Sequence, residues 1–204
     1  DTENSLVFTL TDDQGAVTTL DIMHERPMHI ILVRDDLHYF DHLHPTLQGT
    51  SWDIPLTFLA PGTYRVWVDF TKDMQQYLVD FNFVVGGMTT QPELDHLGDL
   101  RVDVDTPDQV IVGQPVPLQF SVSDSITNKA LPIKDTFLGA AAHLVVIDDT
   151  LTEFIHDHDM TLDQDHIFSF TPTFSQPGIH RAWVQFTVDG KNRVATFPLD
   201  VSEK

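Results

Sequence analysis

The sequence contains a long internal repeat, which limits the chain to architectures built from two copies of one module. Residues 29–44 (HIILVRDDLHYFDHLH) align without a gap with residues 143–158 (HLVVIDDTLTEFIHDH), at an offset of 114 positions. Residues 52–81 align with residues 168–197 at an offset of 116, and residues 5–12 align with residues 117–124 at an offset of 112. A repeating unit of about 100 residues is the size of a small domain.

Each copy is typical of short β-strands separated by turns. In the first copy the candidate strands are rich in β-branched and aromatic residues, and stretches such as DDQG and LAPG between them have the composition of turns. No segment sustains an apolar period of 3.6 residues, so little helix is expected. Trp67 and Trp183 occupy equivalent positions and are expected to pack in the cores. The candidate strands are LVFTL, HIILV, LHYFDHLH, WDIPLTF, TYRVWVDF and YLVDFNFVV.

This pattern predicts an all-β protein with two tandem immunoglobulin-like or cupredoxin-like β-sandwich domains. We expect domain 1 at residues 1–88, a linker at residues 89–99 and domain 2 at residues 100–204. Residues 100–112 are expected to form an opening strand of domain 2. By the same alignment Asp1 falls on Gly113, so residues 1–88 contain no counterpart of this strand. Either the strand lies upstream of Asp1 together with an anchor or tail, which we favour, or domain 1 lacks it.

The composition excludes several classes of partner. The 204 residues carry a net charge of −20, from 31 acidic against 11 basic side chains. This balance argues against nucleic acid and anionic lipid surfaces as partners, and it favours cations. The chain has no cysteine, which rules out disulfides and thiolate metal sites. No apolar stretch approaches the roughly 20 residues of a transmembrane helix, so no transmembrane segment is predicted.

The repeated histidines are the strongest functional signal. The three positions of the first copy fall on three histidines of the second copy at one constant offset, while neighbouring positions have diverged. Three neutral imidazoles suit zinc, copper, nickel or iron(II). The sequence therefore predicts one metal site per domain. The predicted ligands are His29, His42 and His44 in domain 1 and His143, His156 and His158 in domain 2.

A β-hairpin brings these histidines together. If residues 29–33 and 38–44 pair around a four-residue loop, His29 lies opposite His42, and His44 lies on the same face two positions on. In the second copy the same pairing places His143 opposite His156. The alternative interpretation is a polar stripe on a hairpin, with His29 as a hydrogen-bonded core histidine. Recurrence of the triplet in both copies favours the metal site.

A fourth ligand is less clearly indicated. His24 precedes His29 on the approach to the same end of the hairpin, but its counterpart in the second copy is Leu138. Asp69 lies on the strand after the Pro-Gly turn, where the second copy has Gln185. Candidates whose type is not repeated carry less weight than the triplet.

Several of these segments resemble a group of exported bacterial proteins with duplicated, histidine-rich β-sandwich domains of immunoglobulin or cupredoxin type. The segments are HERPM, HIILVRDDLHYFDHLHP and APGTYRVWVDF in the first copy, and FLGAAAHLVVIDD and FIHDHD in the second. The resemblance implies a periplasmic, cell-surface or secreted location and metal binding, usually of copper. In that group His-x-His is commonly followed by proline, as at Pro45, whereas the second copy has Asp159.

Three functions are compatible with these features. The first is an exported metal-binding protein for copper capture, delivery or tolerance, with zinc as the alternative metal and a metal-transfer protein as a candidate partner. The second is a mononuclear copper or iron oxidoreductase that uses an open position beside three histidines. The third is a structural or adhesive surface module stiffened by Ca²⁺. The sequence offers no separate acid, base or substrate pocket, so binding is favoured over catalysis.

Overall fold

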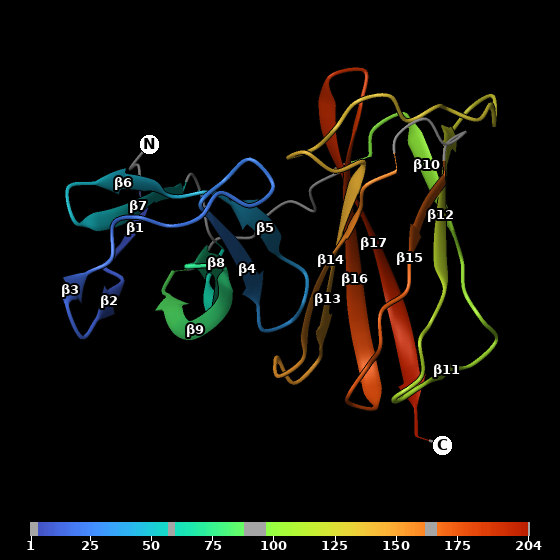
Figure 1. The fold of residues 1–204 in the computed structure, drawn as a ribbon. Helices are drawn as coiled ribbons and strands as arrows, with labels where there is room; N and C mark the ends of the chain where they lie inside the picture. The colour runs from blue at the N-terminus through green and yellow to red at the C-terminus, as the bar shows by residue number, and fades with distance from the viewer. Residues whose placement is uncertain (1–3, 57–59, 88–96, 162–166, 204) are drawn as a thin grey trace. The chain divides into compact units, whose positions relative to one another are not determined.

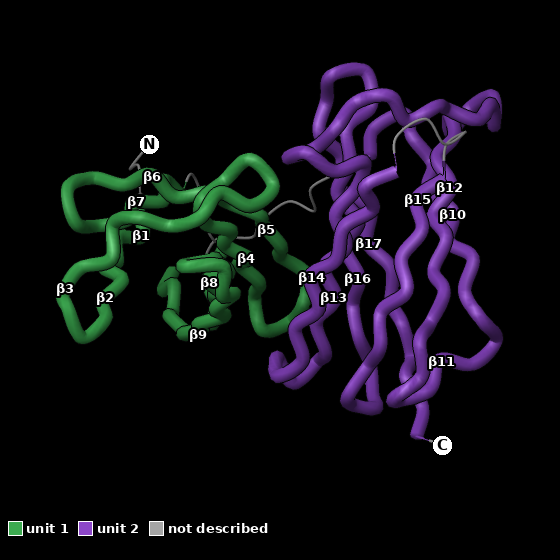
Figure 2. Tube along the Cα trace, viewed as in Figure 1, with its two compact units in different colours: residues 1–93 green, residues 94–204 purple. Residues whose placement is uncertain are grey.

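The computed structural model describes residues 4–56, 60–87, 97–161 and 167–203. All regular secondary structure in these ranges is β-strand, which confirms the predicted all-β class (Figure 1). The chain divides into two compact units, Asp1–Glu93 and Leu94–Lys204 (Figure 2). Positions 89–96 of the predicted linker lie outside the described residues, so the predicted domain boundaries stay a prediction.

The first unit is built from two antiparallel sheets and a small hairpin. One sheet has the order β1-β7-β6, the other has the order β5-β4-β8-β9, and β2 pairs with β3. The candidate strands of the first copy all contribute, each shifted by a few residues at its ends. The strands are β1 (Asn4–Phe8), β2 (Thr11–Asp12), β3 (Gly15–Ala16), β4 (Met28–Arg34), β5 (Phe40–Leu43), β6 (Thr46–Gln48), β7 (Ser51–Leu56), β8 (Gly62–Lys72) and β9 (Gln75–Val85).

Alternation along β4 fixes which face of its sheet meets the core. Met28, Ile30 and Leu32 are buried in one apolar cluster with residues of β7 and β8, among them Trp52 and Val66. Because successive strand residues point to opposite faces, His29 lies on the other face of the same sheet. β4 therefore contributes one face to the sandwich core, and His29 projects from its other face.

The second unit repeats the arrangement of two sheets, with β10 and β11 as strands that have no equivalent among the described residues of the first unit. Its sheets have the orders β10-β12-β15 and β11-β17-β16-β13-β14. The core between them is formed by residues such as Phe120, Leu144, Phe168 and Val184, all at most 1% exposed. The strands are β10 (Leu100–Asp105), β11 (Val110–Ile111), β12 (Leu118–Asp124), β13 (Ala142–Asp148), β14 (Phe154–Asp159), β15 (Ile167–Phe170), β16 (Gly178–Val188) and β17 (Lys191–Ser202).

The segment predicted as the opening strand of domain 2 forms two strands rather than one. β10 pairs antiparallel with β12, and β11 then pairs in parallel with the end of β17, where Val110 is the partner of Val201. The chain thus crosses from one sheet to the other around the turn at residues 106–109. Within the described residues of the first unit, β1, which is equivalent to β12, pairs with β7 alone.

The predicted hairpin register is wrong by two residues. Ile31 is the cross-strand partner of His42 and Val33 is the partner of Phe40. His29 is therefore not paired with His42 in the backbone register. The loop is longer than predicted because Leu37 adopts a left-handed conformation (φ 59°) and donates its N–H to the Arg34 carbonyl oxygen at 2.8 Å. The chain then runs two more residues before pairing begins.

The second unit shows the same register and the same loop. His143 is the partner of His158, and Val145 is the partner of His156. Leu151, equivalent to Leu37, also has a positive φ of 58°. A shift of two residues changes the pairing but keeps every side chain on its original face. The predicted gathering of histidines on one face is therefore preserved in both units.

Candidate metal centre

The first histidine cluster joins three side chains from β4, β5 and the residue that follows β5. His29 Nδ1 lies 3.0 Å from His42 Nε2 and 3.3 Å from His44 Nε2. The ring centroids of His42 and His44 are 4.9 Å apart. One ligand atom from each ring lies within 4.8 Å of the other two, and His29 and His42 are buried. This spacing is close enough for three nitrogens to share one ion.

The second cluster has the same composition and closely similar geometry. His143 Nδ1 lies 3.4 Å from His156 Nε2, and the ring centroids of these two residues are 5.7 Å apart. The ring of His158 lies 4.4 Å from that of His143 and 4.5 Å from that of His156. All six histidines of the predicted triplets are therefore brought into two clusters, one in each unit.

A main-chain carbonyl group orients the first histidine of each cluster. His29 Nε2 lies 3.1 Å from the Met23 carbonyl oxygen, and His143 Nε2 lies 2.9 Å from the Phe137 carbonyl oxygen. A carbonyl oxygen only accepts, so in both rings Nε2 carries the proton and Nδ1 presents its lone pair to the cluster. Histidine ligands of metals characteristically make such a second hydrogen bond.

The carbonyl oxygens come from equivalent turns. Met23 and Arg26 exchange two backbone hydrogen bonds of 3.0 Å, and Phe137 and Ala140 pair in the same way. Both central residues of each turn have positive φ: His24 and Glu25 in the first (48° and 67°), Leu138 and Gly139 in the second (51° and 77°). Two consecutive positive φ values define a type I′ turn. Sequence reasoning missed these carbonyl groups because a backbone acceptor places no demand on side-chain identity.

The strands next to the clusters differ between the two units at one position. Asp69 on β8 is the partner of His29 on the neighbouring strand, and Gln185 on β16 is the partner of His143. Cross-strand partners project from the same face, so each side chain stands beside the first histidine of its cluster. Asp69 Oδ1 accepts a hydrogen bond of 2.8 Å from Gln76 Nε2. The weak sequence candidate Asp69 is thus adjacent to the cluster.

The two equivalent tryptophans do not pack where the sequence analysis expected. Trp67 is the cross-strand partner of Ile31, and Trp183 is the partner of Val145. Ile31 and Val145 are in turn the partners of the histidines at the centre of β5 and β14. Both tryptophans are buried, but they lie on the histidine-bearing faces and outside the two apolar clusters in which the sequence analysis expected them.

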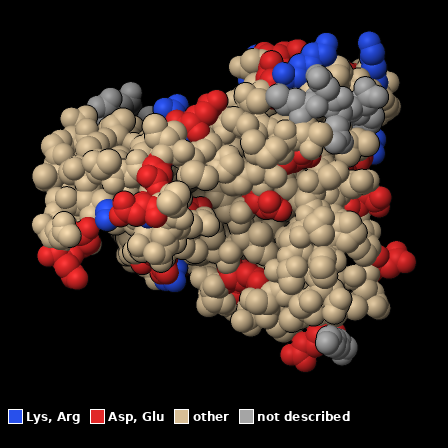
Figure 3. Space-filling model, in the orientation of Figure 1, with Lys and Arg blue, Asp and Glu red and all other residues tan. Residues whose placement is uncertain are grey.

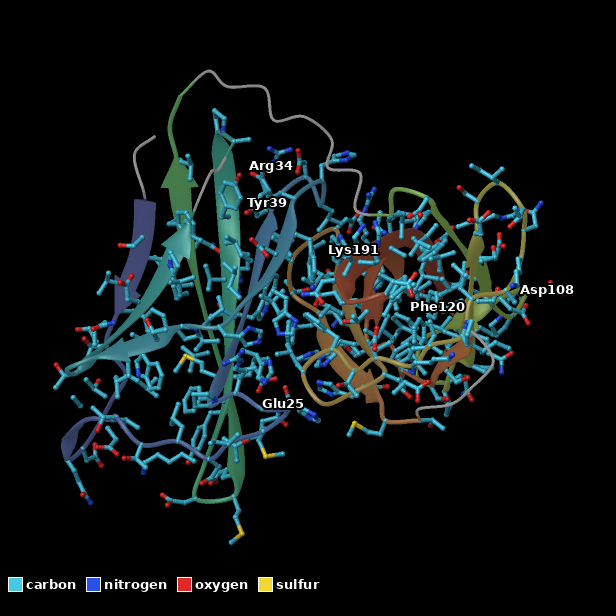
Figure 4. All side chains as sticks on the ribbon, turned by 90° about the horizontal axis from the view of Figure 1, so that it is seen from above. Glu25, Arg34, Tyr39, Asp108, Phe120 and Lys191 are labelled. Carbon is cyan, nitrogen blue, oxygen red and sulfur yellow. The ribbon has the colours of Figure 1, made fainter. Side chains whose placement is uncertain are left out.

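The predicted fourth ligand, His24, stays outside the group of three. Its ring centroid lies 6.2 Å from that of His29, at the turn that supplies the Met23 carbonyl group. Figure 4 shows that Glu25, in the same turn, lies at the opposite end of the β4–β5 hairpin from Arg34 and Tyr39. His38 is exposed in the loop at that far end. The cluster thus lies at the end of the hairpin that is far from the β4–β5 loop and next to the Met23–Arg26 turn.

The protein surface carries many more acidic than basic side chains. Figure 3 shows Asp and Glu scattered over the visible face of both units, with fewer Lys and Arg. Such a surface raises the local concentration of cations and repels polyanions. No helix in the described residues is long and apolar enough to cross a membrane.

Fold and site together define a protein of tandem β-sandwich units. The three histidines of the first unit present ligand atoms close enough together to hold a metal ion, and the second unit brings its three histidine rings within 5.7 Å of one another. The chain belongs to the family described as Domain of unknown function (DUF8832), whose model matches residues 1–87 and 95–203. These two segments coincide with the two copies of the repeat. A search of curated proteins finds no match to this chain.

Proposed function

We propose that this protein is an exported metal-binding protein with one three-histidine site in each unit, serving copper capture, delivery or tolerance. The observation that carries the proposal is the repeated arrangement of the rings: in both units Nδ1 of the first histidine lies within 3.4 Å of Nε2 of the second, while its own Nε2 is held by a carbonyl oxygen. An accidental polar stripe has no reason to repeat this second hydrogen bond.

The donor set is well suited to copper, with zinc as the alternative. Three neutral imidazoles bind both metals, and affinity for a given nitrogen site rises toward Cu²⁺ in the first-row series. His29, His42 and His44 would hold one ion, and His143, His156 and His158 the other. Three protein ligands leave one position of a tetrahedral ion for a solvent molecule or for the ligand of a transfer partner.

An exported location and a metal-transfer partner are part of the same proposal. The resemblance of both histidine segments to exported proteins supports export, and the acidic surface suits a protein that collects cations from dilute solution. Fractionation of cells that produce the protein should recover it outside the cytoplasm. Recovery from the cytoplasm alone would contradict this part of the proposal.

Metal analysis and calorimetric titration of the full chain test the binding function. We expect two equivalents of Cu²⁺ or Zn²⁺, one equivalent after His42→Ala or His156→Ala alone, and none after both changes. His38→Ala removes an exposed imidazole from the same hairpin and serves as the matched control, which should still bind two equivalents. Unchanged stoichiometry in the double variant would overturn the proposal.

A further inference from the structure

Each cluster contains three histidines, but the two units differ in the residue that is paired with the first histidine. Asp69 in the first unit and Gln185 in the second occupy the same cross-strand position next to the first histidine. Both side chains are buried, each at 7% exposure. Neighbouring strands lie about 4.8 Å apart, and partners project from the same face, so each side chain stands beside the first histidine of its cluster.

The carboxylate of Asp69 is held in place rather than directed freely into solvent. Gln76, on the next strand, donates its amide N–H to Asp69 Oδ1 at 2.8 Å. A buried carboxylate is costly unless a positive charge or several hydrogen bonds compensate for lost hydration. A divalent ion among three neutral imidazoles would place a positive charge beside this carboxylate, whereas the equivalent residue of the second unit is a neutral amide.

We propose that Asp69 makes the first site bind divalent cations more tightly than the second, where the neutral amide of Gln185 occupies the equivalent cross-strand position. This inference rests on the proposed metal-binding function and adds a division of labour to it. The first site has the charge balance for a dication such as Cu²⁺ or Zn²⁺. The second, with a neutral amide beside its first histidine, discriminates less between a dication and a monocation.

The size of the effect can be anticipated from residues that surround metal ligands in other proteins. Changing such a neighbour typically alters metal affinity by about 10- to 100-fold. An adjacent negative charge attracts a dication twice as strongly as a monocation at the same distance. The signature of Asp69 is therefore a loss of affinity that is larger for Zn²⁺ than for Ag⁺, which distinguishes charge from a change in shape.

The test isolates each site in the full chain. His156→Ala with His158→Ala leaves the first site, and His42→Ala with His44→Ala leaves the second. Competition with a chelator then gives the Zn²⁺ affinity of each background, and a parallel titration gives the Ag⁺ affinity. We expect the first site to bind Zn²⁺ about 10- to 100-fold more tightly than the second.

Reciprocal changes at the differing position complete the design. Asp69→Asn in the first background should weaken Zn²⁺ binding about 10- to 100-fold and Ag⁺ binding less, and Gln185→Glu in the second background should strengthen Zn²⁺ binding. Asp80→Asn removes an exposed carboxylate paired with Arg65 and should leave both affinities unchanged. Circular dichroism verifies that each variant is folded.

The outcomes separate this inference from the function on which it rests. If neither background binds metal, the proposed metal-binding function fails. If both bind Zn²⁺ equally, or if the reciprocal changes leave the two affinities unaltered, the histidine sites stand and the role of Asp69 is overturned. A loss of equal size for Zn²⁺ and Ag⁺ after Asp69→Asn would also overturn it.

Discussion

His180 Nε2 lies 2.7 Å from Glu153 Oε2, and both side chains are buried within the second unit. His180 Nδ1 also lies 3.0 Å from the Gly178 carbonyl oxygen, which can only accept a hydrogen bond. The Glu153 carboxylate accepts a further hydrogen bond from the Ser175 N–H. Glu153 directly precedes β14, the strand that carries two histidines of the second cluster, so this pair anchors the start of that strand.

The first unit has tyrosines at the same two positions. Tyr39 and Tyr64 align with Glu153 and His180, and their rings meet edge to face with centroids 5.4 Å apart. Tyr64 donates its hydroxyl to the Ala60 carbonyl oxygen at 2.7 Å. The contact between these two equivalent positions is therefore an aromatic pair in the first unit and a histidine–glutamate hydrogen bond in the second.

Removing one member of the buried pair should destabilise the second unit. His180→Ala leaves the buried Glu153 carboxyl group without its imidazole partner and should cost about 1–3 kcal/mol, because a buried polar group that loses its hydrogen-bond partner is not compensated for its lost hydration. Hydrogen exchange resolved by peptide should show faster exchange in residues 97–161 and 167–203. Exchange in residues 4–56 should stay as in the parent.

Copying the aromatic pair into the second unit is the matched control. Glu153→Tyr together with His180→Tyr should cost less than the sum of the two single changes, since contacting residues are not additive. Additive losses would show that the two side chains do not stabilise this contact together.

The carboxylate of Asp148 should make the second unit sensitive to acid. Burial alone would raise the pKa of Asp148, but hydrogen bonds from the Thr150 hydroxyl and from the N–H groups of Glu153 and Thr152 outweigh it, and the pKa lies below its ordinary value. Because the folded-state pKa is lowered, the stabilisation is present above the unfolded value of about 3.9 and is lost as pH falls through the folded value.

Asp148→Asn tests this dependence. The amide cannot accept at both positions, so at neutral pH the second unit should lose about 1–3 kcal/mol of stability. The difference between parent and variant should begin to shrink below about pH 4, where the carboxylate of the unfolded chain takes up a proton, and should be lost once the pH falls below the lowered pKa of folded Asp148. Urea unfolding across this range measures the difference, and Asp200→Asn, an exposed carboxylate on β17, should show none of it. A constant difference at every pH would contradict the assignment.

Metal should stabilise each unit through its own cluster. An ion that binds only the folded chain at 100 times its Kd adds about 2.7 kcal/mol. Zn²⁺ should therefore raise the melting temperature of both units, and a chelator should reverse this increase. In His42→Ala only the second unit should respond. A response of the first unit in that variant would place its metal elsewhere.

The turn beside His29 should be improved by glycine. Glu25 has a φ of 67°, a conformation that costs an L-residue roughly 1–2 kcal/mol, and the equivalent residue of the second unit is Gly139. Glu25→Gly should therefore raise the melting temperature of the first unit, while Gly139→Ala should lower that of the second. Equal melting temperatures before and after both changes would show that the turns carry no such strain.

The repeat made much of this architecture predictable. Runs of β-branched and aromatic residues between turn signals identified the strands, and the constant offset identified the six histidines. The hairpin register could not be predicted, because it depends on the left-handed conformation of Leu37, a residue with no marked preference for it. The histidine face was still correct, since an error of two residues preserves strand parity.

Other features were hidden for different physical reasons. Apolar character alone could not assign Trp67 to a face, because both faces of β8 hold large buried residues. The Met23 carbonyl group leaves no trace in the side-chain pattern. The Glu153–His180 pair joins residues 27 positions apart whose counterparts are tyrosines, so the repeat gave no hint of it.

The parallel pairing of β11 with the end of β17 has a practical consequence for anyone shortening or tagging this chain. Val201 and Ser202 pair with Val110 and Ile111, so the end of β17 fixes β11, which lies about 90 residues earlier in the sequence. A truncation that removes Val201 and Ser202 would remove the pairing partners of β11, so a fusion partner is best attached after Ser202.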